Sequence, residues 1–159
     1  MDQLLTLLEQ NARLSNAELA VMLGRTEEQI AQQIEDYQAR GIIRGFQAMV
    51  DWEQVDRSQI TAYIELNVTP KQGEGFEEIA KRIMQFEEVQ TVYLMSGSYD
   101  LQVVVQGKSF KDVALFVAER LSPLESVTST STSFVLRKYK DRGVIVCDEE
   151  RDERGLTSL

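Results

Sequence analysis

The sequence contains no histidine among its 159 residues. Histidine is the commonest general base and a frequent metal ligand, so its absence excludes Ser-His-Asp and Cys-His catalytic sites. A single cysteine, Cys147, excludes an internal disulfide and a thiolate metal site. Carboxylate chemistry stays open, but no pattern points to it. We therefore expect no enzyme, no catalytic residue, no metal and no cofactor.

Long apolar runs and positive charge are also scarce. No run approaches the length of a membrane span, and the N-terminus lacks the basic and apolar regions of a secretion signal. We expect a cytoplasmic protein with no membrane partner. The 17 Lys and Arg residues face 26 Asp and Glu residues, a net charge of −9. This balance argues against a protein that coats nucleic acid nonspecifically.

The first fifty residues predict three helices. Residues 15–18 (SNAE) and 26–29 (TEEQ) are capping boxes, and Gly24 and Gly41 follow the two helices that these boxes begin. A short capped helix, a glycine turn and a longer capped helix indicate a helix-turn-helix, although a three-helix interaction domain fits equally well. Residues 41–50 then predict a short strand. The expected buried stripes are Leu4, Leu5 and Leu8, then Leu19, Met22 and Leu23, then Ile30, Ile34 and Tyr37.

The second module predicts the order β-α-β-β-α-β, a ferredoxin-like arrangement. Alternating strands are expected at 60–68, 89–95, 101–106 and 126–139, with the turn SGSYD at 96–100. One amphipathic helix follows residue 75, and a second begins after Ser109. The expected buried residues of that second helix are Phe110, Val113, Ala114, Val117 and Leu121.

The helices of such a fold cover one face of the sheet. The other face is more apolar than a solvated face should be, which predicts a homodimer. The residues expected on this dimer face are Tyr63, Tyr93, Met95 and Val104.

This layout resembles the Lrp/AsnC family of bacterial and archaeal transcriptional regulators over residues 2–140. The resemblance rests on LSNAELAVMLGRT, ARGIIRGFQAMVD, GSYDLQVVVQG and TSTSFVLRKYK. It implies an α+β chain with a winged-helix-like helix-turn-helix domain at 1–50 and a linker at 51–59. An effector-binding, oligomerising ferredoxin-like domain follows at 60–140. We expect a partly disordered extension at 141–159, in which residues 144–146 could add an edge strand.

The resemblance also implies function and sites. It implies a regulator that binds double-stranded DNA and a small effector, usually an amino acid, and that forms homodimers which assemble further into octamers. The family commonly has Arg or Lys at positions 32, 33, 35 and 36, where this chain has Gln32, Gln33, Glu35 and Asp36. We predict a glutamine stripe that reads bases. The predicted DNA-binding residues are Arg25, Thr26, Glu28, Gln29, Gln32, Gln33, Arg40 and Arg44; the predicted effector-binding residues are Gly97, Ser98, Tyr99, Asp100, Thr130 and Thr132.

Two alternatives remain. The acidic second helix leaves open an effector-binding oligomer whose helix-turn-helix is vestigial. Sirohaem decarboxylases are similar in architecture, but they use histidine at their haem site, and this chain has none.

Overall fold

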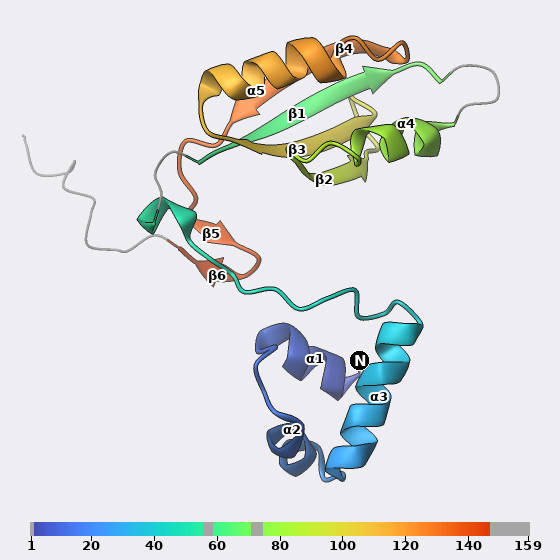
Figure 1. The fold of residues 1–159 in the computed structure, drawn as a ribbon, viewed down its shortest axis with the longest axis vertical. Coiled ribbons are helices and arrows are strands. Elements are labelled where there is room, and N and C mark those ends of the chain that lie inside the picture. The colour runs from blue at the N-terminus through green and yellow to red at the C-terminus, as the bar shows by residue number, and fades with distance from the viewer. Residues whose placement is uncertain (1, 56–58, 71–74, 147–159) are drawn as a thin grey trace, which may run out of the picture. The chain divides into compact units, whose positions relative to one another are not determined.

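The computed structural model describes residues 2–55, 59–70 and 75–146 (Figure 1). The chain separates into two compact units, residues 1–50 and residues 51–159. The first unit is helical, and the second contains a four-stranded sheet, so the α+β expectation is confirmed. Among the residues that the structure describes, no helix is long and apolar enough to cross a bilayer.

The helical unit consists of α1 (Gln3–Gln10), α2 (Asn16–Leu23) and α3 (Glu27–Ala39), and each begins at a side-chain cap. Both predicted capping boxes are present. In the first, the Glu18 carboxylate accepts from the Ser15 backbone at 2.8 Å. Gly24 has φ 63° and Gly41 has φ 66°, the left-handed conformation expected after each helix.

The core of the helical unit is small. It consists of Leu4, Leu8, Leu19, Ala20, Ile30 and Tyr37. The prediction for α2 was wrong at one position, because Met22 is 58% exposed and Ala20 is buried instead. At about 100° per residue, Leu19, Ala20 and Leu23 share one side of this eight-residue helix, and Met22 lies outside that side.

The strand expected at 41–50 does not form. Ile42 and Ile43 donate backbone hydrogen bonds to the Tyr37 carbonyl, and the backbone then continues without ladder pairing to Val50. A strand requires a neighbour for its N–H and C=O groups, and within the described chain this segment has none. Ile43 packs against the helical core, but the other large apolar side chains of the segment are exposed, including Phe46 at 47% and Val50 at 46%. A 3₁₀ turn at Trp52–Gln54 opens the second unit.

The sheet of the second unit has the strand order β2-β3-β1-β4, with every neighbouring pair antiparallel. Its strands are β1 (Ile60–Val68), β2 (Val89–Leu94), β3 (Leu101–Gly107) and β4 (Val127–Phe134). Ala62, Ile64, Leu66 and Val68 alternate into the core as predicted. The β-α-β-β-α-β prediction is confirmed, and β1 lies in the interior of the sheet between β3 and β4.

Helices α4 (Phe76–Ile83) and α5 (Phe110–Phe116) pack on one sheet face (Figure 1). A π-helical stretch, Val117–Leu121, continues α5. The buried residues Val113, Phe116 and Val117 are three and four positions apart, so Ala114 lies to the side of this stripe and is exposed. The predicted Phe110 is the first residue of α5 and is 55% exposed, with its ring against that of Phe134 at 4.8 Å. Val113, Val117 and Leu121 are buried as predicted.

A two-stranded ribbon ends the described chain. Strand β5 (Lys140–Asp141) pairs with β6 (Val144–Ile145). A strand is therefore present at Val144–Ile145, but the prediction that it would be an edge strand of the main sheet is wrong. It forms a separate hairpin with β5 instead, and the turn of this hairpin contains Arg142 and Gly143, both with positive φ. Cys147 and the predicted disorder after it lie outside the described residues.

Candidate DNA-binding helix and effector-binding turn

Helix α3 is the second helix of the helix-turn-helix, and only one side of it contacts the core. Ile30 and Tyr37 are buried, with Gln33 and Ile34 half-buried beside them. At 100° per residue, the opposite side is centred on Glu28, Gln32, Glu35 and Ala39, which are all exposed. A partner that lies along this side of the helix would therefore meet two carboxylates and no cation.

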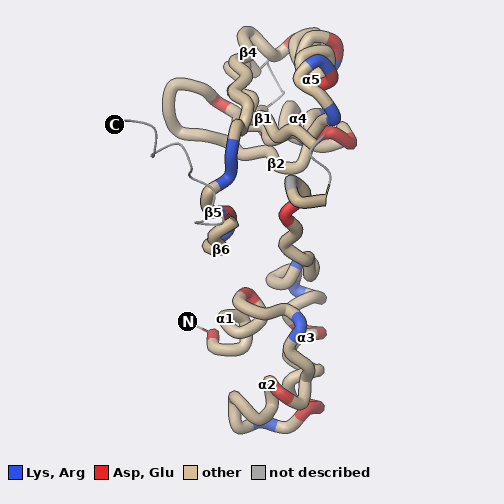
Figure 2. Tube along the Cα trace, turned by 90° about the vertical axis from the view of Figure 1, so that its left-hand side faces the viewer, with Lys and Arg blue, Asp and Glu red and all other residues tan. Residues whose placement is uncertain are grey.

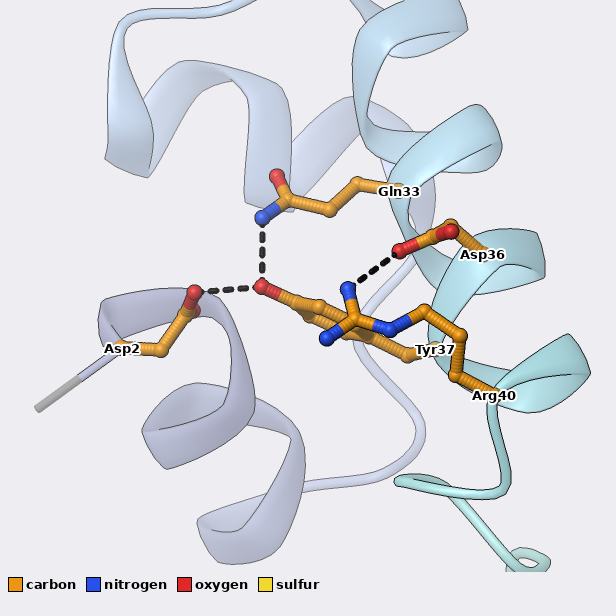
Figure 3. A network of polar contacts seen from close by, with 5 residues as sticks. All are labelled: Asp2, Gln33, Asp36, Tyr37 and Arg40. Atoms are coloured by element: carbon orange, nitrogen blue, oxygen red, sulfur yellow. Dashed lines mark hydrogen bonds and ion pairs between the residues drawn. The ribbon is translucent and has the colours of Figure 1, made fainter.

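A chain of hydrogen bonds crosses from α3 to the start of α1 (Figure 3). The Gln33 Nε2 group donates to the Tyr37 hydroxyl oxygen at 2.6 Å, and the Tyr37 hydroxyl donates to Asp2 Oδ2. Asp2 Oδ1 caps α1 by accepting from the Leu4 N–H at 2.9 Å. At the other end of this chain of hydrogen bonds, Gln33 Oε1 accepts from Arg25 Nη1. Asp2 thus fixes α1 and α3 together, a contact that the sequence analysis missed because only its capping position could be read locally.

This network changes the interpretation of the predicted glutamine stripe. Gln33 does not belong to the exposed surface, because both polar atoms of its side-chain amide form hydrogen bonds within the protein. Its Nε2 group donates to Tyr37, and its Oε1 atom accepts from Arg25. Gln29 is exposed, but its carbonyl accepts from the Thr26 N–H at 3.1 Å in the capping box. Gln32 is exposed and has no side-chain hydrogen bond to the residues that the structure describes. The predicted stripe therefore reduces to Gln32 and the free amide N–H₂ of Gln29.

The cations of the helical unit differ in availability. Residues 1–50 contain four arginines and seven acidic residues, which gives this unit a net charge of −3 (Figure 2). Arg40 pairs with Asp36 at 2.9 Å, and both side chains stay more than half exposed. The Arg44 guanidinium lies beside Gly41, where an added Cβ would approach its Cζ to 2.9 Å. Neither Arg13 nor Arg44 has an ion pair with a described residue.

The bond between Asp2 and Tyr37 predicts a pH-dependent stability. This bond lowers the pKa of Asp2 and raises the pKa of Tyr37. Stability from a lowered carboxyl pKa is present above the unfolded value of about 3.9 and is lost as pH falls through the folded value. For Tyr37, stability is present below about 10 and is lost as pH rises through its raised value.

Tyr37→Phe should cost about 1 kcal/mol at pH 7, since Asp2 is exposed and solvent weakens the bond. Urea unfolding of both proteins, followed by circular dichroism from pH 2.5 to 7, measures the difference. It should shrink below pH 4. A difference that stays constant to pH 2.5 would show that Asp2 contributes nothing to it.

The SGSYD turn joins β2 to β3 and is attached to the interior strand β1. The Met95 N–H donates to the Asp100 carbonyl at 2.8 Å and closes the turn. The Asp100 N–H donates to the Leu66 carbonyl at 3.0 Å, and Asp100 Oδ2 accepts from the Val68 N–H at 2.8 Å. Asp100 Oδ1 has no hydrogen bond to a described residue. One carboxylate oxygen is therefore structural, and the other is available.

Gly97 in this turn is not required by the backbone. Its φ lies outside the left-handed region, and a Cβ built there would meet no atom within 4 Å. Ser98 beside it is exposed, and Tyr99 is half-buried. Nothing in the described part of this chain therefore explains a glycine at position 97.

The hydroxyls of β4 divide between the two sheet faces. Thr130 and Thr132 lie opposite Leu66 and Ile64, on the face that the helices cover. The other face presents Ser129, Ser131 and Ser133, and Asn67 Nδ2 donates to Ser129 Oγ at 2.9 Å. The structure thus brings Gly97, Ser98, Tyr99 and Asp100 together, and Thr130 and Thr132 belong to the covered side of the sheet.

The uncovered sheet face has an apolar centre. Tyr63 on β1 lies directly opposite Val104 on β3. Tyr93 on β2 lies opposite Gln102, which is two residues before Val104 on β3 and shares its face. Tyr63 is 41% exposed and Tyr93 is 55% exposed, whereas Val104 and Met95 are half-buried. Three of the four predicted dimer-face residues therefore lie on this face of the strands, and Met95 lies just beyond β2.

Comparison with known proteins agrees with both units. Residues 61–145 match the model of the Lrp/AsnC ligand binding domain, and residues 3–44 match a winged helix-turn-helix DNA-binding model. The chain is 43% identical over 157 residues to YugG, an uncharacterised HTH-type transcriptional regulator of Bacillus subtilis. That alignment covers 98% of this chain and 95% of YugG.

Two solved structures share the fold. One is a transcriptional regulator of Neisseria meningitidis in complex with L-methionine (TM-score 0.73, 22% identity, 89% of this chain and 93% of that chain). The other is a feast or famine regulatory protein of M. tuberculosis complexed with L-methionine (TM-score 0.72, 22% identity, 89% and 94%). With its two family matches and its relative in B. subtilis, the chain belongs to the Lrp/AsnC family of transcriptional regulators.

Proposed function

We propose that this protein binds specific double-stranded DNA weakly per copy and that a small amino acid modulates the binding. The observation that supports specific binding is the exposed surface of α3, where Gln32 is able to pair with adenine and the N–H₂ group of Gln29 is able to donate to a base acceptor. Arg25, Arg40 and Arg44, with Arg13, are the cations available for phosphates. With a net charge of −3, this unit would bind weakly alone, and several units in an oligomer would add avidity.

DNA retardation with the region upstream of the protein's own gene tests this proposal. The competitor is a shuffled duplex, and the titrations run at 50 and 200 mM salt. We expect preference for the upstream DNA and a slope of log K against log salt of roughly −3 per helix-turn-helix unit, one for each of the few phosphate contacts. Equal binding to both duplexes, or none, would contradict the proposal.

The alternative is an effector-binding oligomer with a vestigial helix-turn-helix. The acidic outward side of α3 and the internal use of Gln33 favour it. It predicts no specific DNA site but unchanged effector binding, so the retardation experiment and a calorimetric titration together distinguish the two functions.

For the effector, we propose a site at Gly97, Ser98, Tyr99 and Asp100. Two observations support it. Asp100 Oδ1 is available and could accept from an α-ammonium group, and Gly97 leaves open space beside the turn although neither the backbone conformation nor a neighbouring atom requires a glycine there. The two relatives crystallised with L-methionine favour an amino acid as the ligand class. Thr130 and Thr132 could contribute only from the helix-covered side of the sheet.

Asp100→Asn should separate ligand binding from folding. Asparagine keeps an acceptor for the Val68 N–H but removes the charge, so stability should hold while amino-acid affinity falls about 10-fold or more. Asp100→Ala removes both and should cost about 1–2 kcal/mol of stability as well. Calorimetry with the twenty amino acids and urea unfolding measure the two effects. Equal affinity of wild type and Asp100→Asn would leave the carboxylate with a structural role only.

We further propose that the uncovered sheet face forms a homodimer, and that such dimers could assemble to octamers. Tyr93→Lys with Val104→Lys should yield monomers in sedimentation velocity, because two charges would enter an apolar contact. Met84→Lys with Leu115→Lys is the matched control, since these side chains are 57% and 42% exposed, directly after α4 and within α5. A dimer that survives the first pair but not the second would move the interface to the helix side.

A further inference from the structure

A chain of hydrogen bonds runs from Arg25 through Gln33 and Tyr37 to Asp2, and the donor of each bond is fixed by the chemistry of these side chains. A carboxylate can only accept, so the Tyr37 hydroxyl must donate its proton to Asp2. The Tyr37 oxygen is then the acceptor for Gln33, which must turn its Nε2 group toward it at 2.6 Å. The Gln33 carbonyl is left at the opposite end, where it can only accept, and it accepts from Arg25.

The pKa shifts maintain this direction near neutral pH. The bond from Tyr37 lowers the pKa of Asp2, so Asp2 is ionised, and the bond to Asp2 raises the pKa of Tyr37, so the phenol keeps its proton. Tyr37 is only 8% exposed, which shields the middle of the chain of bonds from water.

Arg25 is consequently held at two points. Its backbone N–H donates to the Ala20 carbonyl at 3.0 Å, at the end of α2, and its side chain donates to Gln33 on α3. Arg25 lies in the turn between these helices and is exposed. A guanidinium has five N–H donors, so one bond to Gln33 leaves others for a further anion.

We propose that Gln33 and Tyr37 are positioning residues that hold the Arg25 guanidinium ready for a DNA phosphate, and that Gln33 does not read a base. This inference rests on the proposed DNA binding. Holding the side chain in advance removes part of the entropy cost of ordering it on the DNA. Loss of the positioning should weaken binding to specific and shuffled duplexes alike, by about 3- to 10-fold.

The free protein provides the first test. In nuclear magnetic resonance spectra, rotation of the Arg25 guanidinium should be slower than that of Arg13, which is exposed and has no side-chain partner among the described residues. Gln33→Met and Tyr37→Phe should each bring Arg25 to the rate of Arg13, whereas Gln38→Met, the same change at an exposed position of α3, should not. Equal rates for Arg25 and Arg13 in the wild type would overturn the inference without any DNA.

A double-mutant cycle on DNA provides the second test. Arg25→Ala should lower the salt slope by about one. Tyr37→Phe and Gln33→Met should weaken binding 3- to 10-fold in the wild-type background and have no further effect in the Arg25→Ala background. Equal losses in both backgrounds would mean a structural role only and would overturn the positioning. If the wild type binds no duplex while Arg25 rotates slowly, the proposed function fails and Arg25 is held for an anion other than DNA, which also overturns the stated inference.

Discussion

Leu19→Ala is expected to unfold residues 1–50 of the full chain and to leave the sheet unit folded. Leu19 is fully buried in a core of only six buried residues. Leucine-to-alanine changes at such sites cost about 2.7–5 kcal/mol. A unit of fifty residues has a stability of only about 2.5–7.5 kcal/mol, so the loss removes most or all of it. The proposed DNA binding should disappear, and the proposed amino-acid binding should remain measurable by calorimetry.

Hydrogen exchange measured by mass spectrometry on the full chain checks this result by segment. Amides of α1, α2 and α3 should lose protection, while those of β1 and β3 keep it. Val21→Ala is the matched control, because Val21 belongs to the same helix and is 84% exposed. Loss of protection in the sheet as well would show that the two units fold as one.

Reversing the charge of α3 should produce the second large effect. Glu35→Lys with Asp36→Arg changes the charge of the outward and flanking sides by +4 and also frees Arg40 from its pair with Asp36. Two or more new phosphate contacts should tighten binding to shuffled DNA by about 10-fold or more at 0.1 M salt and steepen the salt slope by about two. Selectivity for the upstream DNA should fall, because the new contacts are the same on every sequence.

Two controls separate position from total charge. Glu87→Lys with Glu119→Lys makes the same +4 change at exposed positions of the sheet unit. Glu35→Gln with Asp36→Asn removes the acids of α3 without adding cations. If the sheet-unit pair tightens DNA binding as much as the α3 pair, α3 does not contact DNA.

Features fixed by neighbouring residues could be predicted from the sequence. The capping boxes at Ser15 and Thr26 and the glycine after α3 depend on contacts three to five residues apart, and the structure contains each of them. The alternation of β1 likewise placed its core face correctly, because the side-chain period of a strand is two.

Features decided by distant residues could not be predicted. Gln33 has the residue type of a base reader, but its role depends on Tyr37 and on Asp2, which is 35 residues from Tyr37 in the chain. Phe110 fits the apolar stripe of α5, yet it is the first residue of the helix and contacts Phe134 at the end of β4, so it is 55% exposed while Phe116 is buried. Asp100 was predicted only as an effector-binding residue, and the sequence does not show that one of its carboxylate oxygens accepts from the Val68 N–H of β1.

The strand order has a consequence for how the chain emerges from the ribosome. The helical unit is made of neighbouring segments and can fold as soon as they are synthesised. Strand β1 is interior to the sheet, yet one of its neighbours, β4, follows far behind, with Asn67 and Ser129 separated by 62 residues. At about 5–20 residues per second, β1 waits roughly 3 to 12 s with that edge unpaired. Nascent chains on one polysome are therefore most exposed to strand exchange through β1, and a chaperone that shields residues 60–68 should act in that interval.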